Sequence, residues 1–288
     1  MDLEKYRKSY SELMKIQNTK NLDYYAYPAK YYVKPFLIAG NVYYIGDKKV
    51  CSHLIDTGDG LIVFDSGFPG AAHLMINAIW ELGFNPHDVK YLIHSHEHFD
   101  HIGAACEFKE LYDTKLVISE AGAQIMKNHP NWVYMDAAPY PKSPIFTPDI
   151  TLKDGEIFSL GKVNIRCVHT PGHSPGVMSF FFTTEDAGSV YKFGYFGGAG
   201  YNTLYKEGME AEGRPLSARE DFIHSLKKVM DEDVDIVLGN HPLQNDTLQK
   251  REQMLACPTA NPFIDPQEWG KFCRNLIEQF QEFINSGN

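Results

Sequence analysis

Paired cysteines, long apolar runs and basic clusters are all missing from this sequence of 288 residues. The five cysteines are scattered without a C-x-x-C pair, so neither a thiolate zinc site nor a disulfide framework is expected. No eighteen apolar residues run together, and the charged stretch 1–17 lacks the apolar segment of a secretory signal. We therefore expect a cytoplasmic protein with no attachment to a membrane.

Positive charge is also scarce. The chain has 27 Lys and Arg against 37 Asp and Glu, which gives a formal net charge of −10. No more than two Lys or Arg follow one another, and this argues against a protein that grips phosphate backbones. A small-molecule substrate is expected instead, with no nucleic-acid partner.

No repeat, low-complexity tract or long linker divides the chain, so we expect a single domain over residues 1–288. Residues 1–35 would form an N-terminal arm and residues 243–288 the C-terminal helices. Nothing in the sequence predicts the oligomeric state.

Hydrophobic patterns predict two sheets that share one core. Three alternating and β-branched runs between residues 36 and 65 are typical of antiparallel strands. Helical spacing over 74–82, followed by the apolar run 89–93, predicts a strand–helix–strand unit. Strand patterns return between 148 and 196, and we expect them to form the second sheet.

Further helices and one long loop are predicted around these strands. The capping box 217–220 and the Asp265–Pro266 pair mark two late helix starts. The loop 128–149, with five prolines, is long enough to cover a site. One helix is expected to begin at Asp100, before a strand at 115–119, and to carry Ile102, Cys106, Phe108 and Leu111. The last helix carries Trp269, Phe272, Leu276, Phe280 and Phe283 at helical spacing.

The stretch "HSHEHFDH", residues 94–101, places four histidines, a glutamate and an aspartate between a predicted strand and a predicted helix. Loops at strand ends are where ligands bind in layered α/β folds. Imidazole and carboxylate suit zinc, and two histidines one residue apart can converge on one ion. The sequence therefore predicts a metal site here.

The histidine-rich stretch allows more than one register. The pattern H-x-H-x-D-H, however, fits only one set of residues: His96, His98, Asp100 and His101. His94 would then face the other way at the end of its strand. Glu97 and Phe99 would alternate out of the cluster.

Two more histidines stand in turns bounded by glycine and proline. His173 lies in "TPGHSPG" and His241 in "LGNHP", each after a predicted strand. With these segments and "LIVFDSG", which contains Asp65, the chain resembles the metallo-β-lactamase superfamily from about residue 36 to about residue 242. Within it, the pattern is similar to the subclass of metallo-β-lactamases with three histidines plus Asp-His-His.

The resemblance implies an αββα sandwich, a mixed α/β fold of four layers, with two Zn²⁺ ions per chain at one edge. Asp65 would support the cluster by orienting ligating imidazoles. The implied ligands are His96, His98 and His173 for the first zinc, and Asp100, His101 and His241 for the second.

The likeness has two departures. Many members have an aspartate that bridges the metals about two dozen residues after the third histidine, whereas this chain has Gly197 and Gly198 there. The similar β-lactamases commonly have serines that hold the antibiotic's carboxylate in the segment occupied here by Gly198–Gly200. A main substrate other than a β-lactam is therefore expected.

The expected activity is hydrolysis of a C–N or C–O bond in a small cyclic amide, lactone or ester. Zinc-bound water is acidic enough to supply hydroxide near neutral pH, and Asp100 would act catalytically by orienting it. A true β-lactamase is the alternative. Other classes are a non-catalytic metal-binding protein and a di-iron oxidoreductase, but the oxidoreductase would need a glutamate in place of His98 and a flavin domain.

Residues outside the motifs receive structural interpretations. The tyrosines of "YYAYPAKYY", residues 24–32, are expected to form an ordered arm on the body of the protein. The cysteines are expected to be small buried side chains. Surface or hydrogen-bonded positions are expected for the remaining histidines: His53, His73, His87, His129, His169 and His224.

Overall fold

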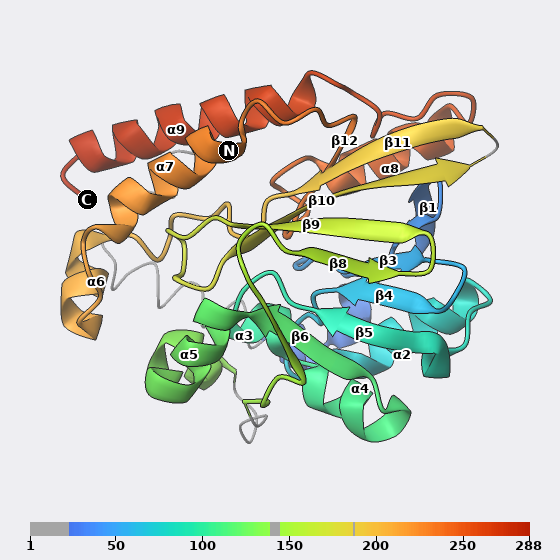
Figure 1. Ribbon diagram of the computed structural model, residues 1–288, viewed down its shortest axis with the longest axis horizontal. Helices are drawn as coiled ribbons and strands as arrows, with labels where there is room; N and C mark the ends of the chain where they lie inside the picture. The colour runs from blue at the N-terminus through green and yellow to red at the C-terminus, as the bar shows by residue number, and fades with distance from the viewer. Residues whose placement is uncertain (1–22, 139–144, 187) are drawn as a thin grey trace.

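The computed structural model describes residues 23–138, 145–186 and 188–288. Two sheets pack face to face, and helices cover both outer faces (Figure 1). The expected αββα sandwich is therefore confirmed. The first sheet has its strands side by side in chain order: β1 (Phe36–Ala39), β2 (Val42–Tyr44), β3 (His53–Asp56), β4 (Leu61–Phe64), β5 (Val89–Ile93), β6 (Lys115–Ser119) and β7 (Ile150–Leu152).

The second sheet follows the order β12-β11-β10-β9-β8. Strands β8 to β11 pair antiparallel, and β12 joins β11 in parallel. The bounds are β8 (Ile157–Leu160), β9 (Val163–His169), β10 (Met178–Asp186), β11 (Ser189–Tyr195) and β12 (Ile236–Leu238).

Strand β7 corrects the expectation that all strands from residue 148 onward belong to the second sheet. It pairs in parallel with β6 of the first sheet. Asp149 fixes this placement, because its amide donates to the Leu116 carbonyl (2.8 Å) and its carboxylate accepts from the Leu116 amide (2.9 Å). Apolar alternation predicts a strand but not which sheet it joins.

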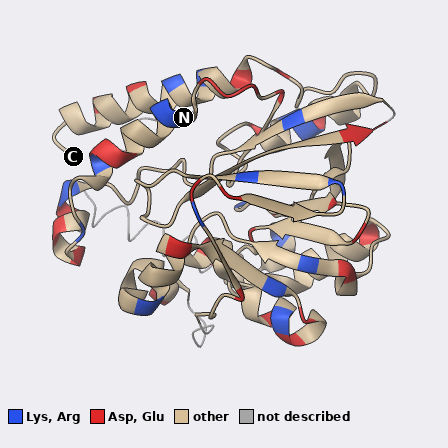
Figure 2. Cartoon of the chain, in the orientation of Figure 1, with Lys and Arg blue, Asp and Glu red and all other residues tan. Residues whose placement is uncertain are grey.

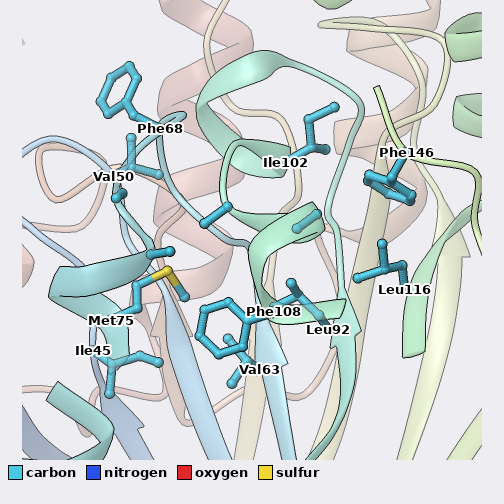
Figure 3. Packing of buried hydrophobic residues seen from close by; sticks show 14 of the residues in the cluster. Ile45, Val50, Val63, Phe68, Met75, Leu92, Ile102, Phe108, Leu116 and Phe146 are labelled. Carbon is cyan, nitrogen blue, oxygen red and sulfur yellow. The ribbon is translucent and has the colours of Figure 1, made fainter. Parts of the chain in front are cut away.

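Three apolar layers hold the four structural layers together. The central layer lies between the sheets and includes Phe64 and Phe180, whose rings stack with centroids 4.8 Å apart. The second packs helices against the first sheet, where Phe108 lies over Val63 and Leu92 (Figure 3). The third packs helices on the second sheet. The α-helices are α2 (Ala72–Glu81), α3 (Phe99–Ile102), α4 (Ala105–Tyr112), α5 (Glu120–Asn128), α6 (Lys206–Glu212), α7 (Ala218–Val229), α8 (Thr247–Ala256) and α9 (Glu268–Asn285).

The helix expected to start at Asp100 is two helices, α3 and α4. The chain breaks at Gly103, whose amide donates to the Gly67 carbonyl (2.9 Å). A Cβ at Gly103 would lie 2.1 Å from the Phe68 carbonyl carbon, so the two backbones approach more closely than any side chain allows. Ile102 and Phe108 are buried as expected, but Leu111, which helical spacing placed with them, is exposed.

The two late helix starts are close to their predicted positions. Helix α7 begins at Ala218, but Ser217 already has helical dihedral angles and makes no side-chain cap, so the capping box is wrong. The Asp265 carboxylate accepts from the Gln267 amide at 2.9 Å, but this bond lies in the turn before α9, whose N-cap Gln267 makes no side-chain cap, so the predicted Asp265 cap is wrong. In α9 the predicted apolar face is confirmed: Trp269, Leu276, Phe280 and Phe283 are buried and Phe272 packs beside them.

The described part of the N-terminal arm packs on the body as expected. Tyr24 is buried, and its hydroxyl donates to the Asp47 carboxylate at 2.7 Å. Of the long loop 128–149, residues 139–144 lie outside the described residues. Residues 130–137 of the loop include the short 3₁₀ helices η4 (Pro130–Val133) and η5 (Met135–Ala137). Two other 3₁₀ helices are η2 (Pro28–Lys30) and η3 (Pro86–Asp88). Among the cysteines, Cys51, Cys167 and Cys273 are buried as expected, Cys106 is half-buried and Cys257 is exposed.

Lys and Arg lie interspersed with Asp and Glu along the outer helices (Figure 2). In the described residues, no helix is both long enough and apolar enough to cross a bilayer.

Candidate metal centre

The carboxyl ends of several strands meet at one edge of the sandwich. Strands β4 and β5 run parallel in the first sheet, as do β11 and β12 in the second. The chain leaves β4 at Asp65, β5 at the stretch 94–101 and β12 just before His241. The turn with His173 follows β9 in the same way. Strand ends therefore gather the predicted site residues from distant parts of the sequence.

His96, His98 and His173 form the first cluster. The Nε2 atoms of His96 and His173 each lie 3.0 Å from Nδ1 of His98. All three side chains are buried, and one nitrogen of each lies within 4.8 Å of the others. The structure thus brings together the three histidines that the sequence assigned to one ion.

Asp100, His101 and His241 form the second cluster. One carboxylate oxygen of Asp100 is 3.7 Å from His101 Nε2, and the other is 3.7 Å from His241 Nε2. The rings of His96 and His101 have centroids 4.2 Å apart, so the clusters adjoin. The side chain of His241 is 35% exposed, and this opens the second cluster to solvent.

The outer nitrogens of three histidines are occupied by acceptors. His173 Nδ1 donates to the Gly200 carbonyl (2.5 Å), His241 Nδ1 to the Lys49 carbonyl (2.8 Å) and His101 Nδ1 to Asp65 (2.8 Å). When the outer nitrogen carries the proton, the inner one presents a lone pair to the cluster. The buried Nε2 of His101 has no hydrogen-bond partner among the described residues.

These donor sets fit metal ions. Lone pairs that converge at 3.0 Å repel one another unless a cation or proton stands between them. Burial lowers the pKa of His173 to about 3. Burial and the neighbouring imidazoles hold the pKa values of His96 and His98 well below the ordinary range. The first cluster is therefore neutral near pH 7, which suits a cation better than a shared proton.

Asp65 lies beneath both clusters in a left-handed conformation, with φ at 57°. Although burial raises its pKa, His101 and the surrounding donors lower it overall, so Asp65 is a carboxylate. It accepts from His101, from the Tyr195 hydroxyl, and from the amide (2.6 Å) and hydroxyl (2.8 Å) of Ser95. Because the Ser95 hydroxyl donates to Asp65, it accepts from Nδ1 of His96, 3.0 Å away.

Three histidines outside the ligand set have hydrogen-bonded rings in the structure. His94 points away from the clusters, with Nδ1 3.0 Å from the Val117 carbonyl. His53 donates to the Gly239 carbonyl (2.9 Å) and His169 to the Pro175 carbonyl (2.8 Å). Glu97 lies out of both clusters but is fully buried, and burial raises its pKa to about 7.

The glycines that replace a bridging aspartate have no room for side chains. A Cβ at Gly197 would lie 2.1 Å from the Met178 carbonyl oxygen. One at Gly198 would lie 2.7 Å from a Val177 methyl and 3.0 Å from the His173 Cβ. A carboxylate at either position would require this segment to move.

Four residues that contact the clusters were not predicted from the sequence: Ser95, Tyr134, Thr203 and Arg214. The Tyr134 ring lies edge-on to the His98 ring, with centroids 5.1 Å apart. Thr203 donates to the His173 carbonyl at 2.6 Å. Of these four, only Ser95 is marked by a local pattern, because it directly precedes the first ligand-type histidine.

The chain is similar to several known proteins. The family model described as "Metallo-beta-lactamase superfamily" matches residues 45–187. The probable metallo-hydrolase YqgX of Bacillus subtilis is 26% identical over 77% of this chain and 95% of its own length. An N-acyl homoserine lactonase of Bacillus thuringiensis is also 26% identical, over 49% of this chain and 61% of its own length. The crystal structure of BJP-1, a subclass B3 metallo-β-lactamase of Bradyrhizobium japonicum, superposes with a TM-score of 0.77 at 26% identity, over 89% of this chain and 95% of that one.

Proposed function

We propose that this chain, which belongs to the metallo-β-lactamase superfamily and is a metal-dependent hydrolase, holds two Zn²⁺ ions and opens a C–N or C–O bond in a small cyclic amide, lactone or ester. The observation that carries the proposal is the pair of adjoining clusters with inward lone pairs. Two cations held there would supply an acidic water and polarise a carbonyl oxygen.

The chain's own residues have distinct parts in this proposal. The histidines of the first cluster stay neutral and fixed, which keeps one side of the site rigid. Asp100 contributes a partly exposed carboxylate with one oxygen toward each histidine of the second cluster. That position lets it orient the attacking water in line with the carbonyl.

A lactone, ester or unactivated cyclic amide is favoured over a β-lactam antibiotic as the main substrate. Gly198–Gly200 offers no side-chain hydroxyl, and added side-chain atoms at Gly198 would collide with Val177. A substrate carboxylate without such donors loses affinity and positioning. The lactonase relative supports a lactone, whereas the likeness to BJP-1 supports the alternative, a true β-lactamase.

A substrate panel tests the proposal. We expect the zinc-loaded protein to hydrolyse a lactone or ester with a kcat/KM well above its values for nitrocefin and a carbapenem. The protein stripped of metal by a chelator is the control, and it should be inactive until zinc returns. A β-lactam kcat/KM of ~10⁶ M⁻¹s⁻¹ would make the chain a true β-lactamase. No turnover of any substrate would leave a metal-binding protein without this activity.

A further inference from the structure

A buried arginine lies against the backbone of the first cluster. Arg214 is 6% exposed, and its guanidinium donates to three oxygens of different segments. Nη1 donates to the Thr203 carbonyl (2.8 Å) and the Tyr134 hydroxyl (3.2 Å), and Nη2 donates to the His173 carbonyl (3.3 Å). Burying a guanidinium is costly unless its donors are used. These contacts therefore restrict the position of all three segments.

The end of helix α6 aims Arg214 at the site. Gly213 adopts a φ of 69°, and the Arg214 amide donates back to the Met209 carbonyl at 2.8 Å. This left-handed glycine ends the helix and turns the chain. Glu212 and Arg214, on either side of it, then face each other, with 3.6 Å between the Glu212 carboxylate and Arg214 Nη1.

Glu212 fastens the segment 130–138, which comprises η4 and η5. Its carboxylate accepts from the Tyr134 hydroxyl (2.7 Å), and its carbonyl accepts from the Trp132 indole (3.2 Å). Tyr134 has a φ of 57°, a conformation that non-glycine residues adopt only when their surroundings hold them there. The hydrogen bonds to Glu212 and Arg214 hold Tyr134 in this left-handed conformation. They also place its ring beside His98.

We call the three mutually contacting residues the clasp: Arg214, Glu212 and Tyr134. It touches His98 and His173, the two histidines of the first cluster that Asp65 and Ser95 do not reach. His173 is held through its carbonyl by Arg214 and Thr203, and His98 is flanked by the Tyr134 ring. In contrast, His96 and His101 are oriented from Ser95 and Asp65. The centre thus has two separate supports.

We propose that Arg214 is a positioning residue for the first metal site, and that the clasp sets His173 for its ion and holds the Tyr134 ring beside His98. This inference rests on the proposed function. Arginine suits the position because the several N–H groups of its planar guanidinium can donate to three acceptors at once, whereas the compact ammonium of lysine cannot span them.

The test replaces Arg214 with methionine and measures the affinity of the chain for Co²⁺ by competition with a chelator. We expect the first bound ion to be held about ten-fold or more weakly, the size seen when an outer partner of a ligand is lost, while affinity for the second is unchanged. The visible spectrum of the first Co²⁺ should shift, which reports changed ligand geometry. Arg214→Lys should recover part of the affinity.

Arg219→Met is the matched control. Arg219 donates to the Leu204 carbonyl (2.9 Å) of the same loop, and its guanidinium lies over the Phe283 ring. This variant should keep the wild-type affinity and spectrum. If Arg214→Met does not fold, the same measurement is made on Tyr134→Phe. This change removes only the hydroxyl that bonds to Glu212 and Arg214. It should shift the Co²⁺ spectrum in the same direction and weaken the first ion by a few-fold.

The outcomes separate this inference from the proposed function. If the wild-type chain binds two ions but Arg214→Met and Tyr134→Phe keep its Co²⁺ affinity and spectrum, the clasp does not position the site and the inference is wrong. An equal loss in Arg219→Met would show a general loosening of the loop and would also overturn it. A wild-type chain that binds no metal would contradict the proposed function itself.

Discussion

At the scale of single residues, the centre depends on groups that orient histidines from outside. The Lys49 carbonyl, the Gly200 carbonyl and the Asp65 carboxylate each take the proton of an outer nitrogen. Each imidazole is thereby fixed in tautomer and direction before any ligand arrives. His53 restrains the backbone near His241 in a similar way, because its Nε2 donates to the Gly239 carbonyl two residues earlier.

His53 makes stability depend on pH. Burial lowers its pKa from the ordinary 6.5 to about 4. The unfolded chain therefore takes up a proton below pH 6.5 that the folded chain refuses until about pH 4. The contribution is fully present above pH 6.5 and falls by up to about 1.4 kcal/mol per pH unit below it.

The variant His53→Gln, which keeps a donor for Gly239, should show a flatter decline of the unfolding free energy between pH 6.5 and 4. Urea unfolding at a series of pH values measures it. His224→Gln, a change at an exposed helix position, should follow the wild-type curve. Parallel curves for wild type and His53→Gln would show that His53 is not held neutral by the fold.

At the scale of elements, the break between α3 and α4 places Asp100 and His101 on a single short turn. Gly103 creates the break by packing its backbone on Gly67 and Phe68. Helix α3 then ends against the turn that follows Asp65, and the Ser66 amide donates to the His101 carbonyl at 2.7 Å. A continuous helix would lose this contact.

Gly103→Ala should therefore destabilise the protein, because a Cβ there meets backbone atoms at 2.1 Å that cannot move independently. We expect a loss of about 1–3 kcal/mol, as for overpacked interiors, in chemical denaturation. Gly270→Ala is the control: its Cβ would meet only the flexible end of Arg274 within α9, and alanine favours a helix. Equal stabilities of the two variants would refute the steric account of the break.

At the scale of the whole molecule, periodic patterns in the sequence predicted most secondary-structure elements. Features that depend on contacts between distant segments could not be predicted in this way. Alternating and helical spacing predicted most strands and the buried face of α9, because burial acts on each element locally. The sheet that β7 joins depends on Asp149 meeting Leu116 across the fold. Likewise, the motif pointed to the six ligand-type residues, but no local pattern marks Arg214 or Tyr134, which meet the site through tertiary contacts.

The central claim is that the two clusters form a dinuclear site, and the number of zinc ions per chain tests it most directly. We expect elemental analysis of gently purified protein to give about two ions per chain. Asp100→Asn removes the only carboxylate of the six ligand-type residues, so that variant should give about one ion per chain and keep its fold. A wild-type ratio near one, or a ratio near two that Asp100→Asn leaves unchanged, would contradict the account.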